Sequence, residues 1–420
     1  MEHNDTDELK EKLGWMDVDI SPDYLDNRDM SDRISAYKRL LEIDFPDNPQ
    51  TGSGACFLWG PRKTGKTTVL KQQFSNARWY DLLDTELQTS LLLRPHRLRE
   101  EILAERPSVV VIDEIQKVPA LLDEVHWLLE NTATKFVLCG SSARKLRKSA
   151  ANLLGGRAWR FELFPLTSAE IDDLDLDRAL LHGTLPAHYL DRSPQRTLKS
   201  YIFEYLQEEI IHEATVRNVP AFARFLEAVG LTHGRLLNYA NLSREAGVTA
   251  KTVREYFQIL KDTLVGYELA PWTQRKKRRL IETAKFYLFD VGVANHLAGV
   301  TQIVPGTDVY GRSFEHFLIG EIRAYLSYRE KDLSMTYWRT STGYEVDLII
   351  GEMEYAIEFK GARRISTQHL KSLRALKEEH DPRLSILVSP SDSLRRTEDG
   401  IDIIPWSLFC RQLWSDEIIQ

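Results

Sequence analysis

The sequence predicts an α/β protein whose first half is a parallel sheet wrapped by helices. In this half, short apolar runs typical of buried strands alternate with stretches compatible with helices, a pattern that favours a parallel sheet. A helical region and a second α/β region are expected to follow. The expected strands of the first sheet are Ala55–Trp59, Arg78–Leu82, Val109–Ile112, Phe136–Gly140 and Ala158–Leu163.

The composition narrows the class of protein. A chain of 420 residues has room for about two to four domains. The net charge of −7 argues against a protein coated in positive charge, so any nucleic-acid contact must come from local patches. Cys56, Cys139 and Cys410 lie far apart in the sequence, which indicates small core residues in a reducing compartment rather than a disulfide framework.

Targeting signals are not apparent in the sequence. Residues 1–12 are acidic and have no apolar core, so they do not form a signal peptide. No stretch approaches the roughly 18 apolar residues of a membrane span. We therefore expect a soluble cytoplasmic protein with no membrane partner.

The first 50 residues are charged and interrupted by Pro22, Pro46 and Pro49. One helix is expected within them, from Asp32 to Ile43. We interpret residues 1–50 as an adaptor segment packed on the first α/β domain. A partly disordered tail is the alternative for the first 20 or so residues.

A glycine-rich segment, Gly60-Pro-Arg-Lys-Thr-Gly-Lys-Thr67, fits the pattern G-x-x-x-x-G-K-[ST] between an apolar run and a helix-compatible run. Its backbone N–H groups and the helix N-terminus would surround phosphate oxygens. Lys66 would reach the β- and γ-phosphates of ATP, and the Thr67 hydroxyl would bind Mg²⁺. A glycine-rich turn without a ligand is the alternative. The expected ATP-binding residues are Gly60, Pro61, Arg62, Lys63, Thr64, Gly65, Lys66, Thr67 and Thr68.

A second motif, Val109-Val-Val-Ile-Asp-Glu114, supports the first. Its apolar run predicts a strand buried on both faces of a parallel sheet, which places Asp113 at the carboxyl end beside the glycine-rich loop. Asp113 would hold Mg²⁺ directly or through water. Glu114 would then be the base that orients the water attacking the γ-phosphate. Together the two motifs predict a nucleotide-hydrolysing site.

Two further residues are candidates for this site. Ser141 follows the apolar run Phe136–Gly140 and would sense the γ-phosphate; a serine that caps the next helix is the alternative. Arg157 precedes the strand Ala158–Leu163 and could act as an arginine finger on the nucleotide of a neighbouring subunit, which would require a homo-oligomer. A solvated arginine on a turn is the alternative.

These motifs, with Gly140-Ser-Ser142, Gly155-Gly-Arg157 and Phe164-Pro-Leu-Thr-Ser-Ala-Glu170, resemble those of prokaryotic AAA-type ATPases whose C-terminal half is domain of unknown function 4143. The second half of the chain resembles that domain in Gly183-Thr-Leu-Pro186, Lys285-Phe-Tyr-Leu-Phe-Asp290 and Glu345-Val-Asp347. The similarity extends over roughly residues 50–410. It implies an ATPase core of AAA type at 51–175 and assigns little established biology.

Residues 176–232 are expected to form a helical connector, and residues 233–300 a winged helix. The segment 238–260 has the spacing of a helix-turn-helix, with Thr249 capping the second helix and Arg254 facing outward. Strands at Leu264–Leu269 and Lys285–Phe289 would flank a basic tip that suits phosphate contact. Docking of a protein is the alternative role. The tip contains Arg275, Lys276, Lys277, Arg278 and Arg279.

Residues 301–420 are expected to form a restriction-endonuclease-like α/β domain. A helix is followed by a strand with Asp347 and by another, Tyr355-Ala-Ile-Glu-Phe-Lys360, in which Glu358 and Lys360 share a side. This arrangement resembles the PD-(D/E)xK nuclease core, with Val346 where the usual proline stands. The resemblance implies that Asp347 and Glu358 bind Mg²⁺, that Lys360 positions water and that Glu315 completes the site. A surface hairpin with a Glu358–Lys360 salt bridge is the alternative.

The sequence therefore predicts an ATP-hydrolysing protein of nucleic-acid metabolism or defence that could cleave DNA through its C-terminal domain. Such cores also persist as inactive binding platforms. A nucleotide-switched regulator with a non-cleaving C-terminal domain is the main alternative, and a remodeller without cleavage is another.

Overall fold

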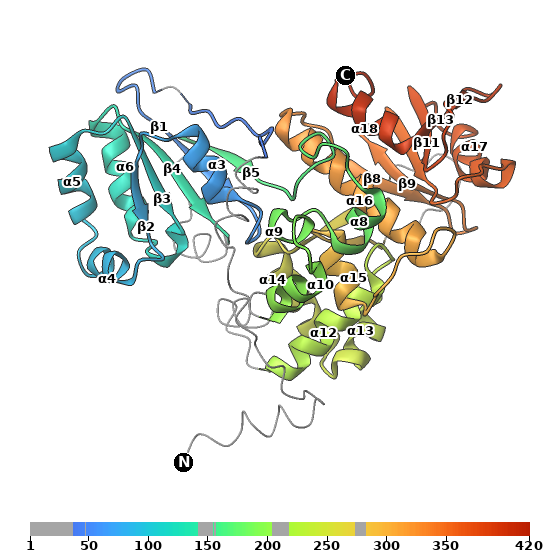
Figure 1. Cartoon of the computed structure of the whole chain (residues 1–420), viewed down its shortest axis with the longest axis horizontal. Coiled ribbons are helices and arrows are strands. Elements are labelled where there is room, and N and C mark those ends of the chain that lie inside the picture. The colour runs from blue at the N-terminus through green and yellow to red at the C-terminus, as the bar shows by residue number, and fades with distance from the viewer. Residues whose placement is uncertain (1–36, 47, 142–153, 155–156, 204–217, 274–282) are drawn as a thin grey trace, which may run out of the picture.

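The structure is a computed structural model that describes residues 37–46, 48–141, 154, 157–203, 218–273 and 283–420. Figure 1 shows a first sheet at one end of the molecule, a second sheet at the other and a group of helices between them. The basic tip expected at residues 275–279 lies outside the described residues, as does most of the segment before Arg39.

The first sheet confirms the predicted parallel α/β architecture. Its order is β2-β3-β4-β1-β5, and every neighbouring pair is parallel. Because β4 lies between β1 and β3, the loop after β1 and the acidic end of β3 are one strand apart at the same edge. The strands are β1 (Gly54–Trp59), β2 (Arg78–Asp81), β3 (Val109–Asp113), β4 (Lys135–Gly140) and β5 (Ala158–Glu162).

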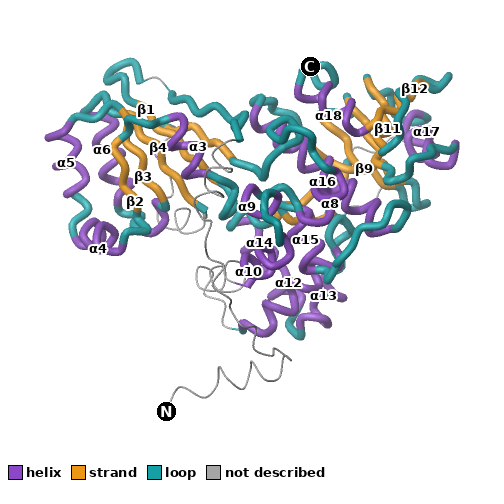
Figure 2. Tube along the Cα trace, viewed as in Figure 1, coloured by secondary structure: helices purple, strands orange, loops and turns teal. Residues whose placement is uncertain are grey.

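Helices cover both faces of this sheet (Figure 2). They are α3 (Lys66–Gln73), α4 (Thr85–Leu93), α5 (Arg97–Glu105), the short 3₁₀ helix η1 (Ile115–Lys117) and α6 (Leu121–Asn131). β1 and most of β3 are buried, so alternate residues of one strand enter different cores, as expected for a central parallel strand. Cys56 and Cys139 are free and buried in one of these cores.

The helix expected from Asp32 to Ile43 is wrong for its described part, because residues 37–46 contain no helix. The backbone of this segment is hydrogen-bonded by side chains of other elements instead. The Leu40 N–H donates to Glu170 (2.7 Å), and the Leu41 carbonyl accepts from Gln73 of α3 (2.6 Å). Leu41 is buried against the first domain. Tertiary contacts thus replace the hydrogen bonds that a helix would have made.

The helices between the two sheets include the pair expected for a helix-turn-helix. Thr249 caps α14 as expected, its Oγ1 accepting from the Thr252 N–H at 3.2 Å, and Val253 and Phe257 are buried. An antiparallel hairpin of β6 and β7 follows. The elements are α8 (Leu176–His182), α9 (Pro186–Tyr189), α10 (Pro194–Tyr201), α12 (Val219–Thr232), α13 (Tyr239–Ala246), α14 (Ala250–Asp262), β6 (Gly266–Pro271), β7 (Lys285–Leu288) and α15 (Val291–Leu297).

The second sheet extends across residue 300, where the sequence suggests a domain boundary. Its order is β12-β13-β11-β10-β9-β8-β6-β7, and the β6–β7 hairpin joins it through parallel pairing of β6 with β8. None of the helices in the described part of the chain is long and apolar enough to cross a membrane. The remaining elements are α16 (Asp308–Tyr328), β8 (Met335–Arg339), β9 (Glu345–Ile350), β10 (Tyr355–Phe359), η4 (Thr367–Leu370), α17 (Lys371–Lys377), β11 (Leu384–Ser389), β12 (Arg395–Arg396), β13 (Ile401–Pro405) and α18 (Trp406–Trp414).

Candidate nucleotide site and C-terminal carboxylate site

The glycine-rich loop forms the turn between β1 and α3, as the sequence predicts. Gly65 is the N-cap of α3 and has φ +93°, in the left-handed region that favours glycine. Lys66 is the first helical residue and is 7% exposed. Its Nζ donates to the carbonyls of Gly60 (2.8 Å) and Pro61 (3.0 Å), so the ammonium group lies over the loop. An anion placed at the loop would meet both the lysine and the amide groups at the helix N-terminus.

The two residues expected to bind Mg²⁺ near this loop are in direct contact. The Thr67 hydroxyl donates to Asp113 Oδ2 at 2.8 Å, and Asp113 is 3% exposed. A hydroxyl and a carboxylate are hard oxygen donors of the kind that Mg²⁺ takes. This donor set, next to a phosphate-binding turn, therefore fits the ion.

Glu114 lies beside Asp113, and its backbone has φ +57°. Its carboxylate accepts hydrogen bonds from the Gln116 side-chain amide and from Ser141 Oγ, the latter at 3.4 Å. Gln116 Nε2 also lies 3.2 Å from Ser141 Oγ. The structure thus brings the expected base and the expected sensor together through Gln116, a buried residue to which sequence reasoning gave no role. Gln116 follows the acidic pair in the sequence, but its contact with Ser141, just after β4, was not predictable from the sequence.

Arg157 lies away from this cluster. Its guanidinium pairs with Glu130 of α6 at 2.8 Å and lies 3.2 Å from His126 Nε2, and its side chain is 44% exposed. β5 begins immediately after Arg157 and runs parallel to β1, with Ala158 opposite Ala55. Arg157 is therefore at the amino end of the strands, and the length of a strand, roughly 15–20 Å, separates it from the loop after β1. Within its own chain, the arginine does not face the nucleotide site.

The C-terminal residues expected to form a second site also converge. Lys360, just after β10, forms an ion pair with Glu358 and lies 3.8 Å from Asp347 Oδ2 on β9. Asp347 Oδ2 also accepts the Phe359 N–H at 2.9 Å. Glu358 is 2% exposed, and burial together with the neighbouring Asp347 carboxylate raises its pKa well above the usual range.

Sequence reasoning missed a second lysine in this cluster. Lys285 of β7 is buried, and its Nζ lies 3.0 Å from Glu315 Oε1 and 2.6 Å from Glu345 Oε1. The Tyr287 hydroxyl donates to Glu315 at 2.5 Å, and Arg339 pairs with Glu345 at 2.6 Å. Burial raises the pKa of Glu315, whereas Lys285 acts in the opposite direction. The Glu315 and Glu345 carboxylates are thus paired with cations from two regions of the chain, Lys285 and Arg339.

This cluster offers a metal ion fewer ligands than the sequence suggests. Within the described ranges, no group of three or more His, Cys, Asp or Glu side chains is arranged to hold a metal. Glu315 already contacts Lys285 and Tyr287. Glu358 Oε2, however, is buried and has no hydrogen-bond partner among the residues that the structure describes. Glu358 and Asp347 therefore remain as the pair that fits a divalent cation.

The expected nucleic-acid residues are only partly described. Arg254 of α14 is exposed, and its guanidinium lies over the Tyr239 ring, 4.8 Å from the ring centre. The other candidates, Arg275, Lys276, Lys277, Arg278 and Arg279, are outside the described residues.

The glycine-rich turn after β1, the acidic end of β3 and the parallel strand order are typical of the P-loop fold of AAA-type ATPases. Family comparison agrees: the AAA domain matches residues 53–172, and the domain of unknown function 4143 matches residues 310–409. A further domain of unknown function, numbered 8612, matches residues 173–303. The chain thus has an AAA domain and a C-terminal domain of the 4143 type.

Sequence similarity to other proteins covers most of the chain. An uncharacterized protein of Mycobacterium tuberculosis is 27% identical over 361 residues, which cover 83% of this chain and 79% of that protein. An uncharacterized protein of Mycobacterium bovis has the same identity and coverage. A solved structure, the Walker-type ATPase of Pyrococcus abyssi, is 14% identical with a TM-score of 0.41, covering 66% of this chain and 99% of that chain.

Proposed function

We propose that the protein binds ATP with Mg²⁺ and hydrolyses it. The observation that carries this proposal is the convergence of Lys66, Thr67 and Asp113 at the carboxyl edge of the first sheet. Lys66 would exchange the loop carbonyls for the β- and γ-phosphate oxygens, since charged acceptors form stronger hydrogen bonds than neutral ones. Mg²⁺ held by Thr67 and Asp113 would supply positive charge against the same oxygens.

Glu114 is proposed as the residue that orients the attacking water. Its carboxylate accepts hydrogen bonds from Gln116 and Ser141, and these contacts would orient it toward a water molecule at the γ-phosphate. A carboxylate in this position accepts a proton from the water as the water attacks phosphorus. Ser141, which contacts Glu114, would then also lie close to the γ-phosphate and could sense its presence.

Replacing Lys66 tests nucleotide binding. The Lys66→Ala variant is expected to bind a fluorescent ATP analogue roughly 10–100-fold more weakly than wild type, because a hydrogen-bonded charge on the phosphates is lost. Titration of the analogue in the presence of Mg²⁺ measures the affinity. Lys71→Ala, on the same helix but one turn further from the loop, serves as the matched control and should retain wild-type affinity. Equal affinity of Lys66→Ala and wild type would contradict the proposal.

Arg157 is proposed to act on the nucleotide of a neighbouring subunit in a homo-oligomer. Support comes from its exposure and from its position at the sheet edge remote from its own loop. Arg157→Ala is then expected to lower the turnover per subunit about 100-fold or more at concentrations where wild type is assembled. ATPase activity measured against protein concentration checks this. A variant with wild-type turnover at every concentration would exclude a finger role.

A second candidate function is metal-dependent cleavage of DNA by the C-terminal domain, within nucleic-acid metabolism or defence. The order α16, β8, β9, β10, α17, β11 supports it, with antiparallel pairing from β8 to β10 and parallel pairing of β10 with β11. This order resembles the PD-(D/E)xK nuclease core. Asp347 and Glu358 would hold the metal ion, and Lys360 would orient water or balance charge on the phosphate.

The rival interpretation is a nucleotide-switched regulator or a remodeller whose C-terminal domain only binds its partner. The pairing of Glu315 and Glu345 with Lys285 supports it, because those carboxylates are already neutralised. If the protein acts on nucleic acid, the outward face of α14, with Arg254, would supply a contact with DNA. Binding of DNA that weakens steeply with salt would favour a nucleic-acid function, and a protein-only switch would show no binding.

Cleavage assays separate these functions. Linear, supercoiled and single-stranded DNA would be incubated with Mg²⁺ or Mn²⁺, with and without ATP. Wild type is expected to cleave at least one substrate, and Asp347→Ala to lose the activity, because a metal ligand is removed. Asp402→Ala, an acidic position on β13 of the same sheet that pairs with Arg396, is the control. No cleavage by wild type, despite measurable ATPase activity, would favour the regulator or remodeller.

A further inference from the structure

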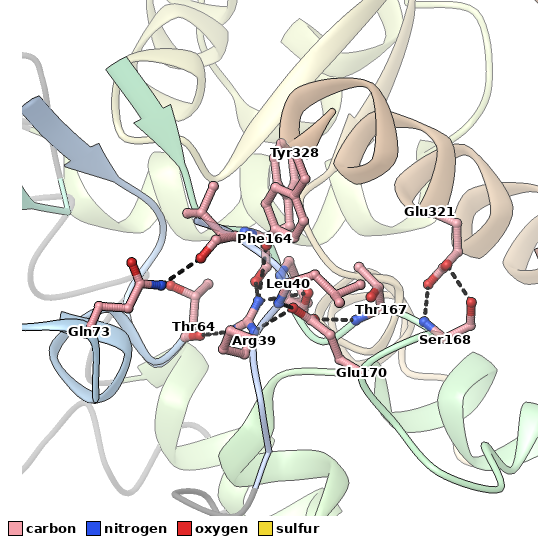
Figure 3. A network of polar contacts seen from close by, with 12 residues as sticks. Arg39, Leu40, Thr64, Gln73, Phe164, Thr167, Ser168, Glu170, Glu321 and Tyr328 are labelled. Atoms are coloured by element: carbon pink, nitrogen blue, oxygen red, sulfur yellow. Dashed lines mark hydrogen bonds and ion pairs between the residues drawn. The ribbon is translucent and has the colours of Figure 1, made fainter. Parts of the chain in front are cut away.

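Arg39 connects the phosphate-binding loop to the C-terminal half of the chain (Figure 3). The residue is 8% exposed, and its guanidinium donates in several directions. Nη1 donates to the Thr64 carbonyl in the loop at 2.6 Å. Nη2 donates to the Phe164 carbonyl after β5 at 2.7 Å and to the Tyr328 hydroxyl on α16 at 3.1 Å. One buried side chain therefore joins the loop, the end of the first sheet and the long helix of the second domain.

A buried charge of this kind needs a partner, and Glu170 supplies it. Arg39 Nε donates to Glu170 Oε1 at 2.9 Å, and the Glu170 side chain is fully buried. Glu170 also accepts the backbone N–H groups of Leu40 (2.7 Å) and Thr167 (2.9 Å). Buried ion pairs add little stability compared with well-packed apolar residues, so stability alone does not account for an arginine here. Its specific value lies in the directed hydrogen bonds that a planar guanidinium makes.

The bond to Thr64 has a consequence for phosphate binding. The carbonyl of Thr64 and the N–H of Gly65 belong to one planar trans peptide, so they point in opposite directions. A donor that holds the carbonyl on one side therefore turns the Gly65 N–H to the other. Thr64 is itself fully buried, with its hydroxyl donating to the Pro61 carbonyl at 2.8 Å. Arg39 thereby fixes the orientation of a peptide in the loop that surrounds phosphate.

On the Tyr328 side of Arg39, α16 contacts the first domain at several points. The Tyr328 hydroxyl also accepts the Phe164 N–H at 3.2 Å. One helical turn or more earlier, Arg323 donates to Glu162 of β5 at 2.7 Å, and Glu321 accepts from the Ser168 N–H and hydroxyl, both at 2.7 Å. The contacts of Tyr328 and Glu321 appear side by side in Figure 3.

The same helix carries Glu315 of the C-terminal carboxylate site. Glu315 and Tyr328 are separated along α16 by roughly 20 Å, at about 1.5 Å per residue. A continuous helix transmits a displacement at one end to the other more directly than a loop would. The structure thus provides a physical connection from Thr64 through Arg39 and Tyr328 to Glu315.

We propose that Arg39 is a positioning residue for the nucleotide site, and that its bonds to Thr64 and Tyr328 couple nucleotide binding to α16. This inference rests on the proposed binding of ATP. When phosphate occupies the loop, the Thr64–Gly65 peptide is fixed more tightly, and so is the guanidinium that holds it. Tyr328 and α16 then become less mobile when nucleotide is bound. Because α16 carries Glu315, the nucleotide state would in this way affect the C-terminal site.

Hydrogen exchange of the full-length protein, with and without a non-hydrolysable ATP analogue and Mg²⁺, tests the coupling. Peptides from 54–73 report binding at the loop, and peptides from 308–328 report α16. Protection of both regions is the expected result. Protection of 54–73 with no change in 308–328 would overturn the coupling and leave nucleotide binding intact. No change in either region would refute nucleotide binding, and with it this inference.

Paired variants of α16 separate coupling from packing. Tyr328→Phe removes the hydroxyl that accepts from Arg39 and keeps the ring. Tyr325→Phe makes the same change on the same helix, where the hydroxyl instead bonds Asp416 (2.6 Å) and the Ile419 carbonyl (2.9 Å). Tyr328→Phe is expected to weaken analogue binding about threefold to thirtyfold and to lose the nucleotide-dependent protection of α16. Tyr325→Phe should keep both.

Arg39→Lys completes the test. A lysine retains the charge beside Glu170 but lacks the planar fork that reaches Thr64 and Tyr328 together. Arg39→Lys is expected to weaken analogue binding at least as much as Tyr328→Phe, and the double variant to be no weaker than Arg39→Lys alone. Identical affinities in Tyr328→Phe, Tyr325→Phe and wild type would overturn the inference, as would full additivity in the double variant.

Discussion

Glu114→Gln is expected to bind ATP with wild-type affinity and to hydrolyse it about 100-fold more slowly or worse. The amide keeps the shape of the side chain and its place beside Gln116 and Ser141, but it cannot accept a proton from water. General-base catalysis typically contributes at least this factor. Phosphate release under saturating ATP measures turnover, and titration of a fluorescent analogue measures affinity.

Neighbouring substitutions distinguish loss of the base from loss of its orientation. Gln116→Ala leaves the Glu114 carboxylate in place but removes a hydrogen bond that orients it, so a smaller fall in turnover, about tenfold, is expected. Wild-type turnover of Glu114→Gln would show that another group serves as the base. A fall in affinity equal to the fall in turnover would indicate a damaged loop rather than a missing base.

Lys285→Met is expected to destabilise the second domain by about 3–5 kcal/mol. The variant leaves the half-buried carboxylates of Glu315 and Glu345 without the buried ammonium group that contacts both. Removing one partner of a buried ion pair leaves a charge uncompensated, whereas replacing the whole pair is tolerated far better. Denaturant unfolding followed by circular dichroism measures the change, with the transition of the second domain analysed separately.

A surface pair provides the matched comparison. Lys261 pairs with Glu268 at 3.0 Å, and both side chains are 31% exposed, so Lys261→Met should cost at most about 1 kcal/mol. Adding Glu315→Gln to Lys285→Met is expected to restore part of the lost stability, because one of the two half-buried negative charges disappears. If Lys285→Met costs no more than Lys261→Met, the lysine is not the counter-charge of this cluster.

The geometry of the candidate nucleotide site was largely predictable from the sequence because its parts are local. A loop between an apolar run and a helix places Gly65, Lys66 and Thr67 with few alternatives, since the strand and the helix fix both ends of the turn. Asp113 ends a run that is apolar enough to be a central strand. Parallel strands bring their carboxyl ends to one edge, so Thr67 and Asp113 were expected close together there, as the structure shows.

The C-terminal cluster was predictable only in part. Asp347 and Glu358 lie on two strands that are adjacent in sequence and form a hairpin, and Lys360 directly follows the second strand. Their proximity therefore followed from the hairpin and from alternation along its strands. Lys285 reaches the cluster from β7, because β6 pairs with β8 and extends the sheet. No local pattern in the sequence predicts that β6 pairs with β8. A single lysine on an apolar strand also does not indicate which carboxylate it contacts.

The contacts of Arg39 could not be predicted from the sequence. The local pattern around it favours a helix, and within the helix a charged side chain would face solvent. Its actual partners, Thr64, Glu170 and Tyr328, are between 25 and 289 residues away along the chain. Sequence alone determined the strand, turn and helix of the proposed phosphate-binding loop, because strand, turn and helix propensities act between near neighbours. Only the tertiary structure decided which buried charges meet, because a buried charge is stabilised by whichever partner the fold places beside it.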